Sequence, residues 1–201
     1  MSRGVGREHE STRRAIAVAA CEVVADLGPT ALSVRRVALA AGVSAGRVQH
    51  YYPDRLSLLL AAFDQIQAEV AEAVRARTEP EEEPRELVEA ILTELIPVDA
   101  ASAARLRVMS GFETLSLTEP LIARRLHEGH AALLELLEHL LCRCALAPGH
   151  AARDTAELLL ALAEGLSWQV LLGHQASEPS LSLLRRTVET FLPADDSHSK
   201  N

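Results

Sequence analysis

Apolar residues recur at spacings of three and four along most of this chain, which is the periodicity of amphipathic α-helices. The first such stretch spans residues 11–27, and Gly28 followed by Pro29 should end it. Its predicted buried face comprises Ile16, Ala19, Ala20, Val23, Val24 and Leu27. Two short helices should follow over residues 33–40 and 44–51, and each begins at a serine that can cap its N-terminus.

Helical periodicity continues to the end of the chain, and prolines separate the segments. A long helix should open at Pro53-Asp54 and end near residue 77. Five more helices are expected over residues 85–96, 100–117, 119–146, 150–174 and 178–192. No segment reads as a strand, and alanine and leucine, both strong helix formers, are abundant. We therefore predict an all-α fold of about nine helices.

The clearest break in the pattern is the segment Thr-Glu-Pro-Glu-Glu-Glu-Pro at residues 78–84. Two prolines around three glutamates cannot easily continue a helix, so we place the end of the fourth helix there. The predicted division is a head at residues 1–56, a body at 57–193 joined to it by the helix at 54–77, and disordered ends at 1–6 and 194–201.

Charge is distributed unevenly between these parts. The chain carries a formal net charge of −8, but residues 1–56 hold eight arginines against five acidic residues, a balance of +3 that leaves −11 for the rest. A basic head on an acidic body points to a polyanionic partner at one end only. The three cysteines are an odd number, and neither a signal peptide nor a membrane-spanning run is apparent. We expect a cytoplasmic protein with reduced thiols and no membrane contact.

The two short helices have the features of a helix-turn-helix. A three-residue turn, Ala41-Gly42-Val43, joins them, and Gly42 can adopt the left-handed conformation that a sharp turn needs. Val43 should then pack into the core of the head, while the helix that Ser44 caps projects its outer face. The free backbone N–H groups at that capped end favour a phosphate.

The projecting face carries small or hydrogen-bonding residues and no acid. Ala45 and Gly46 permit close approach to a groove, Arg47 can form a bidentate contact with guanine, and Gln49 can do so with adenine. The remaining side chains suited to holding phosphates or a base edge are Arg35, His50, Tyr51 and Arg55.

The stretch from Ala31 to Leu60, ALSVRRVALAAGVSAGRVQHYYPDRLSLLL, resembles the DNA-binding domain of the TetR (tetracycline-repressor) family. Gln49 stands where many members have tyrosine, and Tyr52-Pro53 replaces the common phenylalanine and the variable residue after it. By this resemblance the base-facing positions are Arg35, Ala45, Gly46, Arg47 and Gln49, and the phosphate-facing positions are Ser33, His50, Tyr51 and Arg55.

For the body, the resemblance is one of architecture. It implies that the middle helices enclose a small-molecule site and that the last two helices pair with their symmetry mates in a homodimer. The last two helices are rich in leucine, and their apolar surface is broader than the single stripe that a helix buried on one side needs. This breadth agrees with a dimer interface, although a thick core would also explain it. Candidate ligand-binding residues are Met109, Phe112, Leu115, Leu126, His130, Leu133, Leu137, Glu164 and Trp168, with His130 and Glu164 as polar anchors.

The sequence thus favours a ligand-responsive repressor that binds a palindromic operator, although activation stays open. An enzyme is the main alternative class, but we found no catalytic motif, no cofactor fingerprint and no metal-ligand spacing, and we expect neither a cofactor nor a metal. Cys142 and Cys144 diverge by about 200° on a helix and make poor co-ligands. A second alternative is a helical ligand-binding or scaffold protein without DNA binding, which the set of Arg35, Arg47 and Arg55 disfavours.

Overall fold

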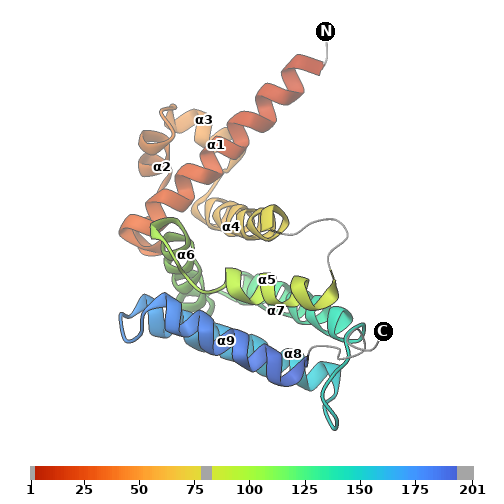
Figure 1. Ribbon diagram of the computed structural model, residues 1–201. Coiled ribbons are helices and arrows are strands. Elements are labelled where there is room, and N and C mark those ends of the chain that lie inside the picture. The colour runs from red at the N-terminus through yellow and green to blue at the C-terminus, as the bar shows by residue number, and fades with distance from the viewer. Residues whose placement is uncertain (1–2, 78–82, 194–201) are drawn as a thin grey trace. The chain divides into compact units, whose positions relative to one another are not determined.

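The computed structural model describes residues 3–77 and 83–193, and these residues form helices joined by turns, with no strand among them (Figure 1). The all-α prediction is confirmed. The elements in order are α1 (Arg3–Leu27), the 3-10 turn η1 (Pro29–Ala31), α2 (Val34–Ala40), α3 (Ala45–Tyr51), α4 (Arg55–Arg77), α5 (Pro84–Glu94), α6 (Ala100–Ser116), α7 (Pro120–Leu141), α8 (Ala152–Leu171) and α9 (Ser177–Phe191).

Three helix boundaries differ from the sequence prediction by three residues or more. Helix α1 begins at Arg3 rather than residue 11, so residues 3–6 are helical and not disordered; no proline interrupts this charged segment. Helix α7 ends at Leu141 rather than residue 146, because the chain tightens into i→i+3 bonds, such as the one from Cys144 N to Leu141 O at 3.1 Å. Helix α8 ends before Gly173, whose φ of 73° is left-handed. The predicted disordered tail at 194–201 lies outside the described residues.

The chain packs into two compact units. The first unit comprises Met1–Ala71 with Arg107–Leu126, and the second comprises Glu72–Leu106 with His127–Asn201. Helix α6 and the first turns of α7 therefore contribute residues to the first unit, which the sequence-based head at residues 1–56 does not include. The functional division of the chain at residue 56 stays a prediction.

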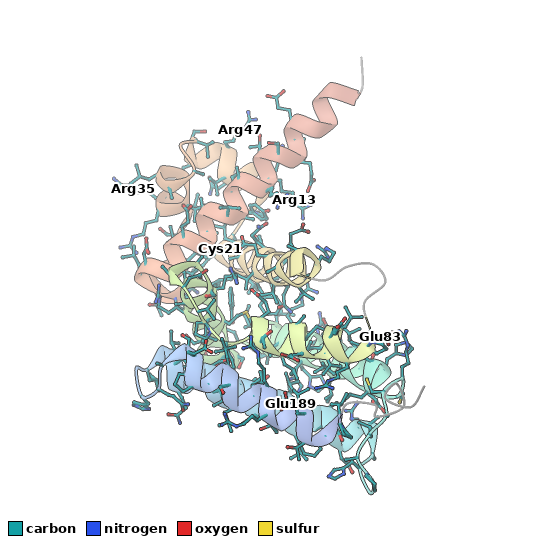
Figure 2. All side chains as sticks on the ribbon, in the orientation of Figure 1. Arg13, Cys21, Arg35, Arg47, Glu83 and Glu189 are labelled. Carbon is teal, nitrogen blue, oxygen red and sulfur yellow. The ribbon has the colours of Figure 1, made fainter. Side chains whose placement is uncertain are left out.

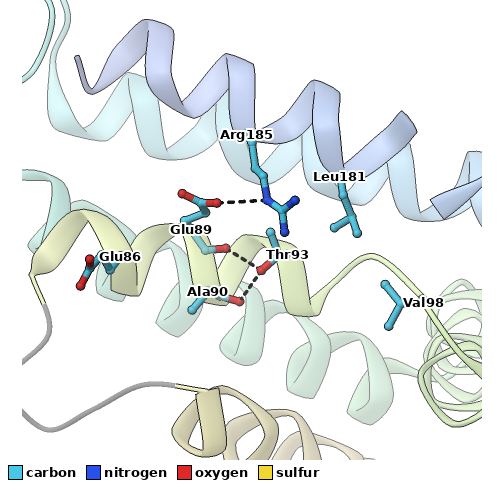
Figure 3. Close-up of a pocket in the computed structure, with 7 residues that line it drawn as sticks. All are labelled: Glu86, Glu89, Ala90, Thr93, Val98, Leu181 and Arg185. Carbon is cyan, nitrogen blue, oxygen red and sulfur yellow. Dashed lines mark hydrogen bonds and ion pairs between the residues drawn. The ribbon is translucent and has the colours of Figure 1, made fainter. Parts of the chain in front are cut away.

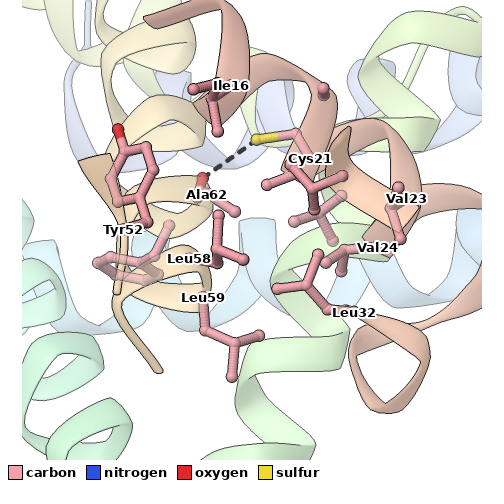
Figure 4. Close-up of a cluster of buried hydrophobic side chains, with 14 of the residues drawn as sticks. Ile16, Cys21, Val23, Val24, Leu32, Tyr52, Leu58, Leu59 and Ala62 are labelled. Atoms are coloured by element: carbon pink, nitrogen blue, oxygen red, sulfur yellow. Dashed lines mark hydrogen bonds between the residues drawn. The ribbon is translucent and has the colours of Figure 1, made fainter. Parts of the chain in front are cut away.

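The core of the first unit forms where α1 packs against α2 and η1, and where α4 and α6 supply further apolar side chains. Figure 4 shows part of this cluster, including the thiol of Cys21, which donates to the carbonyl of Ala62 at 3.3 Å. Burial raises the pKa of Cys21 to about 12. Leu27 was predicted on the buried face of the first helix, but it is exposed because it lies at the last position of α1.

The core of the second unit lies among α5, α7, α8 and α9. Helix α8 packs along α9, and α5 contacts both of them. Two serine hydroxyls join α8 and α9 to the segment between α5 and α6. Ser167 of α8 donates to the carbonyl of Leu95 at 2.7 Å, and Ser177 of α9 donates to that of Pro97 at 2.6 Å. The second unit is thus a helical bundle with its own hydrophobic core.

Candidate nucleic-acid interface

The turn between α2 and α3 has the conformation that the sequence predicts. Gly42 has a left-handed φ of 65°, and the N–H of Val43 donates to the carbonyl of Ala38 at 3.0 Å. This arrangement places Val43 against the core of the first unit, where Val37 and Val48 are fully buried. The helix-turn-helix is therefore a packed element, with α3 carried on its outside.

Helix α3 has one buried side chain, Val48, with 0% of its surface exposed. At its start the hydroxyl of Ser44 accepts the N–H of Arg47 at 3.1 Å, and at the start of α2 the hydroxyl of Ser33 accepts that of Arg36 at 3.4 Å. Among the other residues of α3, Tyr51 is half-buried and the rest are exposed, namely Ala45, Gly46, Arg47, Gln49 and His50. None of them is acidic, so one whole face of α3 is open to a polyanion.

Each helix of the helix-turn-helix carries an exposed arginine that the sequence predicts to face bases. Figure 2 shows Arg35 on α2 and Arg47 on α3, and both side chains are exposed. No atom lies within 4 Å of the position that a Cβ on Gly46 would take, so the start of α3 also leaves room for close approach. The structure thus places the predicted base-facing residues on α2 and on the outer face of α3, and their contacts with bases stay predictions.

Arg55 makes a contact that the sequence did not predict. Its Nη2 atom donates to the carbonyl of Pro29 in η1 at 2.9 Å, which joins the start of α4 to the turn after α1. The ring of Pro29 also lies against Gly111 of α6, whose added Cβ would come within 2.9 Å of it. Arg55 therefore has a structural role in the first unit, and its phosphate contact stays a prediction.

Helix α1 adds side chains next to α3 that sequence reasoning missed. The ring of His9 lies 4.6 Å from that of Tyr51 and 6.1 Å from that of His50, measured between centroids. Nη2 of Arg47 donates to the hydroxyl of Thr12 at 3.4 Å. His9 was missed because the predicted helix starts at residue 11, and the signal at residues 3–10 is only the lack of a helix breaker. Thr12 lies within the predicted helix, but its contact with Arg47 joins residues 35 positions apart and has no local signal.

The C-terminal end of α3 is also fixed to α1. The hydroxyl of Tyr52 donates to the carbonyl of Arg13 at 3.2 Å, and burial raises the pKa of this tyrosine. Tyr52 is one of the two positions at which the chain departs from the family pattern, and its ring is buried in the core of the first unit.

The predicted ligand-binding residues fall into two groups. Phe112 is fully buried in the core of the first unit, where its ring meets that of Phe63 edge-on at 5.4 Å. Three partly buried residues pack against the same core, namely Met109, Leu115 and Leu126. In the second unit, Leu137 is fully buried and Leu133 packs beside that core. Nδ1 of His130 on α7 lies 3.5 Å from the carboxylate of Glu164 on α8, so the two expected anchors are neighbours.

A groove of about 510 Å³ runs between α5 and α9 in the second unit (Figure 3). Nε of Arg185 donates to the carboxylate of Glu89 across it at 3.2 Å. The other lining residues are Glu86, Ala90, Thr93, Val98 and Leu181, and none of the predicted ligand-binding residues is among them.

One side of α8 is apolar and exposed. Leu158 and the C-cap residue Leu172 have 57% and 59% of their surfaces open, and Ala161 and Gly165 lie between them at helical spacing. No atom lies within 4 Å of the position of an added Cβ on Gly165. Trp168, 37% exposed, lies beside the same stripe. By contrast, Leu159 and Leu166 of α8 and Leu184 of α9 are buried in the core of the second unit.

Two family models match this chain. Residues 16–62 match that of the bacterial regulatory proteins of the tetR family, and residues 84–193 match that of the C-terminal part of BetI-type transcriptional repressors. A helix-turn-helix followed by such a helical region defines a DNA-binding transcriptional regulator. The chain belongs to the TetR family of these regulators.

Individual relatives agree with this assignment. The HTH-type transcriptional regulator BetI 1 of Chromohalobacter salexigens is 30% identical over 155 residues, which cover 77% of this chain and 76% of that protein. A transcriptional regulator from Rhodococcus sp. Rha1 has a TM-score of 0.77 at 25% identity, covering 89% and 95% of the two chains. A protein of Saccharomonospora viridis, crystallised in complex with choline, shares the fold alone, with a TM-score of 0.78 at 20% identity, covering 90% and 96% of the two chains.

The matched families and relatives are transcriptional regulators, so the prediction of a regulator rather than an enzyme is confirmed. Within the described ranges, no helix combines the length and apolar character that crossing a bilayer requires.

Proposed function

We propose that this regulator is a repressor that binds a palindromic operator as a homodimer and leaves it when a small, largely apolar effector binds. The observation that carries the proposal is the exposed outer face of α3: Val48 is the only buried residue of this helix, and none of its residues is acidic. In this docking the N-terminal end of α3 enters a major groove, with Arg47 and Gln49 at base edges. Ser33, His50, Tyr51 and Arg55 hold the phosphates.

Selection of bound duplexes from a random-sequence pool tests the DNA-binding part. We expect an inverted repeat whose half-sites are centred about 34–36 Å apart, because each copy presents one α3 to successive major grooves. A gel-shift with the DNA next to the protein's own gene is the companion experiment. Failure to recover any duplex at low salt would favour a helical ligand-binding protein without DNA binding.

The proposed homodimer uses the exposed stripe of α8 together with α9. Small residues at Ala161 and Gly165 let a second helix approach closely, and Leu158 and Leu172 would be buried by it. Leu158→Glu or Leu172→Glu should dissociate the dimer, which sedimentation experiments would detect. The matched control is Leu117→Glu, because Leu117 is 83% exposed and lies in the first unit. Wild type that sediments as a monomer at all concentrations would contradict this part.

The proposed effector contacts include the neighbouring side chains of His130 and Glu164 and the indole of Trp168, which lies one turn after Glu164 on α8. Choline is the first molecule to test, since a protein of the same fold holds it. Its quaternary ammonium is a cation with an apolar surface, and an aromatic ring beside a carboxylate suits such a group.

Fluorescence reports effector binding directly, because Trp168 is the only tryptophan. Choline should change its emission in wild type and much less in Glu164→Gln. A helix that contributes to both units can carry the response, and α4 does so: residues to Ala71 belong to the first unit and those from Glu72 to the second. In this mechanism, effector binding shifts α4 and weakens operator affinity by a coupling of about 1–3 kcal/mol. If choline changes neither emission nor operator affinity, then choline is not the effector.

A further inference from the structure

We infer that Thr12 on α1 is a positioning residue that orients Arg47 for base reading. The inference rests on the proposed DNA-binding function and extends the reading apparatus beyond the helix-turn-helix. Its basis is that α1 runs past the start of α3, so that one face of α1 contacts side chains at both ends of α3.

The hydroxyl of Thr12 is set up to accept a hydrogen bond from Arg47. Its single proton is committed, because Oγ1 donates to the carbonyl of Glu8 at 2.9 Å. The oxygen lone pairs then remain for Nη2 of Arg47 at 3.4 Å. The main-chain N–H of the same arginine is held separately by Ser44 at 3.1 Å. Arg47 is therefore anchored at its backbone and at one tip of its side chain.

This anchoring leaves the donors that base reading needs. A guanidinium has five N–H groups, and a bidentate contact with guanine uses two of them. Thr12 occupies one, and the Arg47 side chain remains exposed. A free arginine side chain loses rotamer freedom when it binds, whereas one already restrained by a neighbour loses less. The Thr12 contact thus favours the bound orientation before DNA arrives.

A second contact from α1 supports the other end of α3. The rings of His9, His50 and Tyr51 form a cluster in which His50 and Tyr51 lie 5.2 Å apart, edge to face, and His9 lies against Tyr51 at 4.6 Å. This cluster restrains the two side chains proposed to hold phosphates. His9 and Thr12 are three residues apart, so they lie on the same side of α1.

The test compares two duplexes: one recovered from the random pool by wild-type protein, and one with a base-pair change at the guanine whose preference disappears in Arg47→Ala. The measured quantity is the ratio of the two dissociation constants. Thr12→Val, which keeps the shape and removes the hydroxyl, should reduce this ratio about three- to tenfold. Thr12→Ser keeps the acceptor and should preserve it.

Two further variants separate positioning from folding. Thr12→Ala should give the same ratio of dissociation constants as Thr12→Val. Agreement between the two variants would exclude a folding defect specific to valine as the cause. In an Arg47→Ala background, Thr12→Val should leave the ratio unchanged, because the residue it positions is gone. His9→Ala should weaken both duplexes alike, since its neighbours hold phosphates.

Several results would overturn the inference. An unchanged ratio in Thr12→Val would show that Thr12 does not orient Arg47. Full additivity of Thr12→Val and Arg47→Ala would show that the two residues act independently. If wild-type protein recovers no duplex from the pool, the proposed function fails and the inference fails with it; the wild-type selection therefore distinguishes the two failures.

Discussion

The packing of α3 predicts opposite effects from two adjacent substitutions. Val48 is 0% exposed, so Val48→Ala removes two methyl groups from the core of the first unit. At about 0.8 kcal/mol for each group, the lost transfer energy is about 1.6 kcal/mol, and the cavity left behind raises the total to about 2–3 kcal/mol. Gln49 is exposed, so Gln49→Ala should change the free energy of unfolding by less than about 0.5 kcal/mol.

Urea unfolding followed by circular dichroism measures the first effect, and titration of selected and base-substituted duplexes measures the second. Val48→Ala should lose stability but keep base discrimination under conditions where it is folded. Gln49→Ala should keep stability and lose about 1–3 kcal/mol of discrimination at one base pair. A Val48→Ala variant as stable as wild type, or a Gln49→Ala variant that discriminates normally, would refute the orientation of α3 described above.

Other predictions concern the arginines, salt and the thiols. Arg55→Ala loses the hydrogen bond to the Pro29 carbonyl, so its free energy of unfolding should fall by about 1 kcal/mol. Because Arg55 is proposed to hold a phosphate, the variant should also bind all duplexes more weakly by the same factor, and a selective loss for one sequence would contradict this. Affinity should fall linearly with salt on a logarithmic plot, and a flat plot would argue against phosphate contacts. At pH 8 a disulfide reagent should label the exposed Cys142 readily and spare Cys21, whose pKa is about 12; rapid labelling of Cys21 in folded Cys142→Ser would show that it is accessible.

Local signals in the sequence were sufficient to predict the helix-turn-helix. A serine before each short helix and a glycine between them act within a few residues, and the structure confirms both caps and the left-handed Gly42. Signals of this kind depend little on the rest of the fold. The prediction of which side chains of α3 are exposed is therefore confirmed, except for the half-buried Tyr51, while their contacts with DNA stay predictions.

Tertiary contacts were harder to anticipate. The bond from Arg47 to Thr12 joins residues 35 positions apart, and that from Arg55 to Pro29 joins residues 26 apart; neither has a periodic signature. The start of α1 was missed because the absence of a breaker is a weaker signal than a cap. The body gave no local motif for a ligand. Packing divided six of the predicted ligand-binding residues between two cores and left His130, Glu164 and Trp168 exposed.

The measurement that tests the central claim most directly is protection of guanine N7 from methylation by dimethyl sulfate in a bound duplex, since N7 faces the major groove. If the exposed face of α3 reads that groove in each copy of a dimer, two clusters of protected guanines should appear about one helical turn apart, and Arg47→Ala should remove protection at one guanine in each. Tight binding with every guanine N7 still reactive would contradict the account.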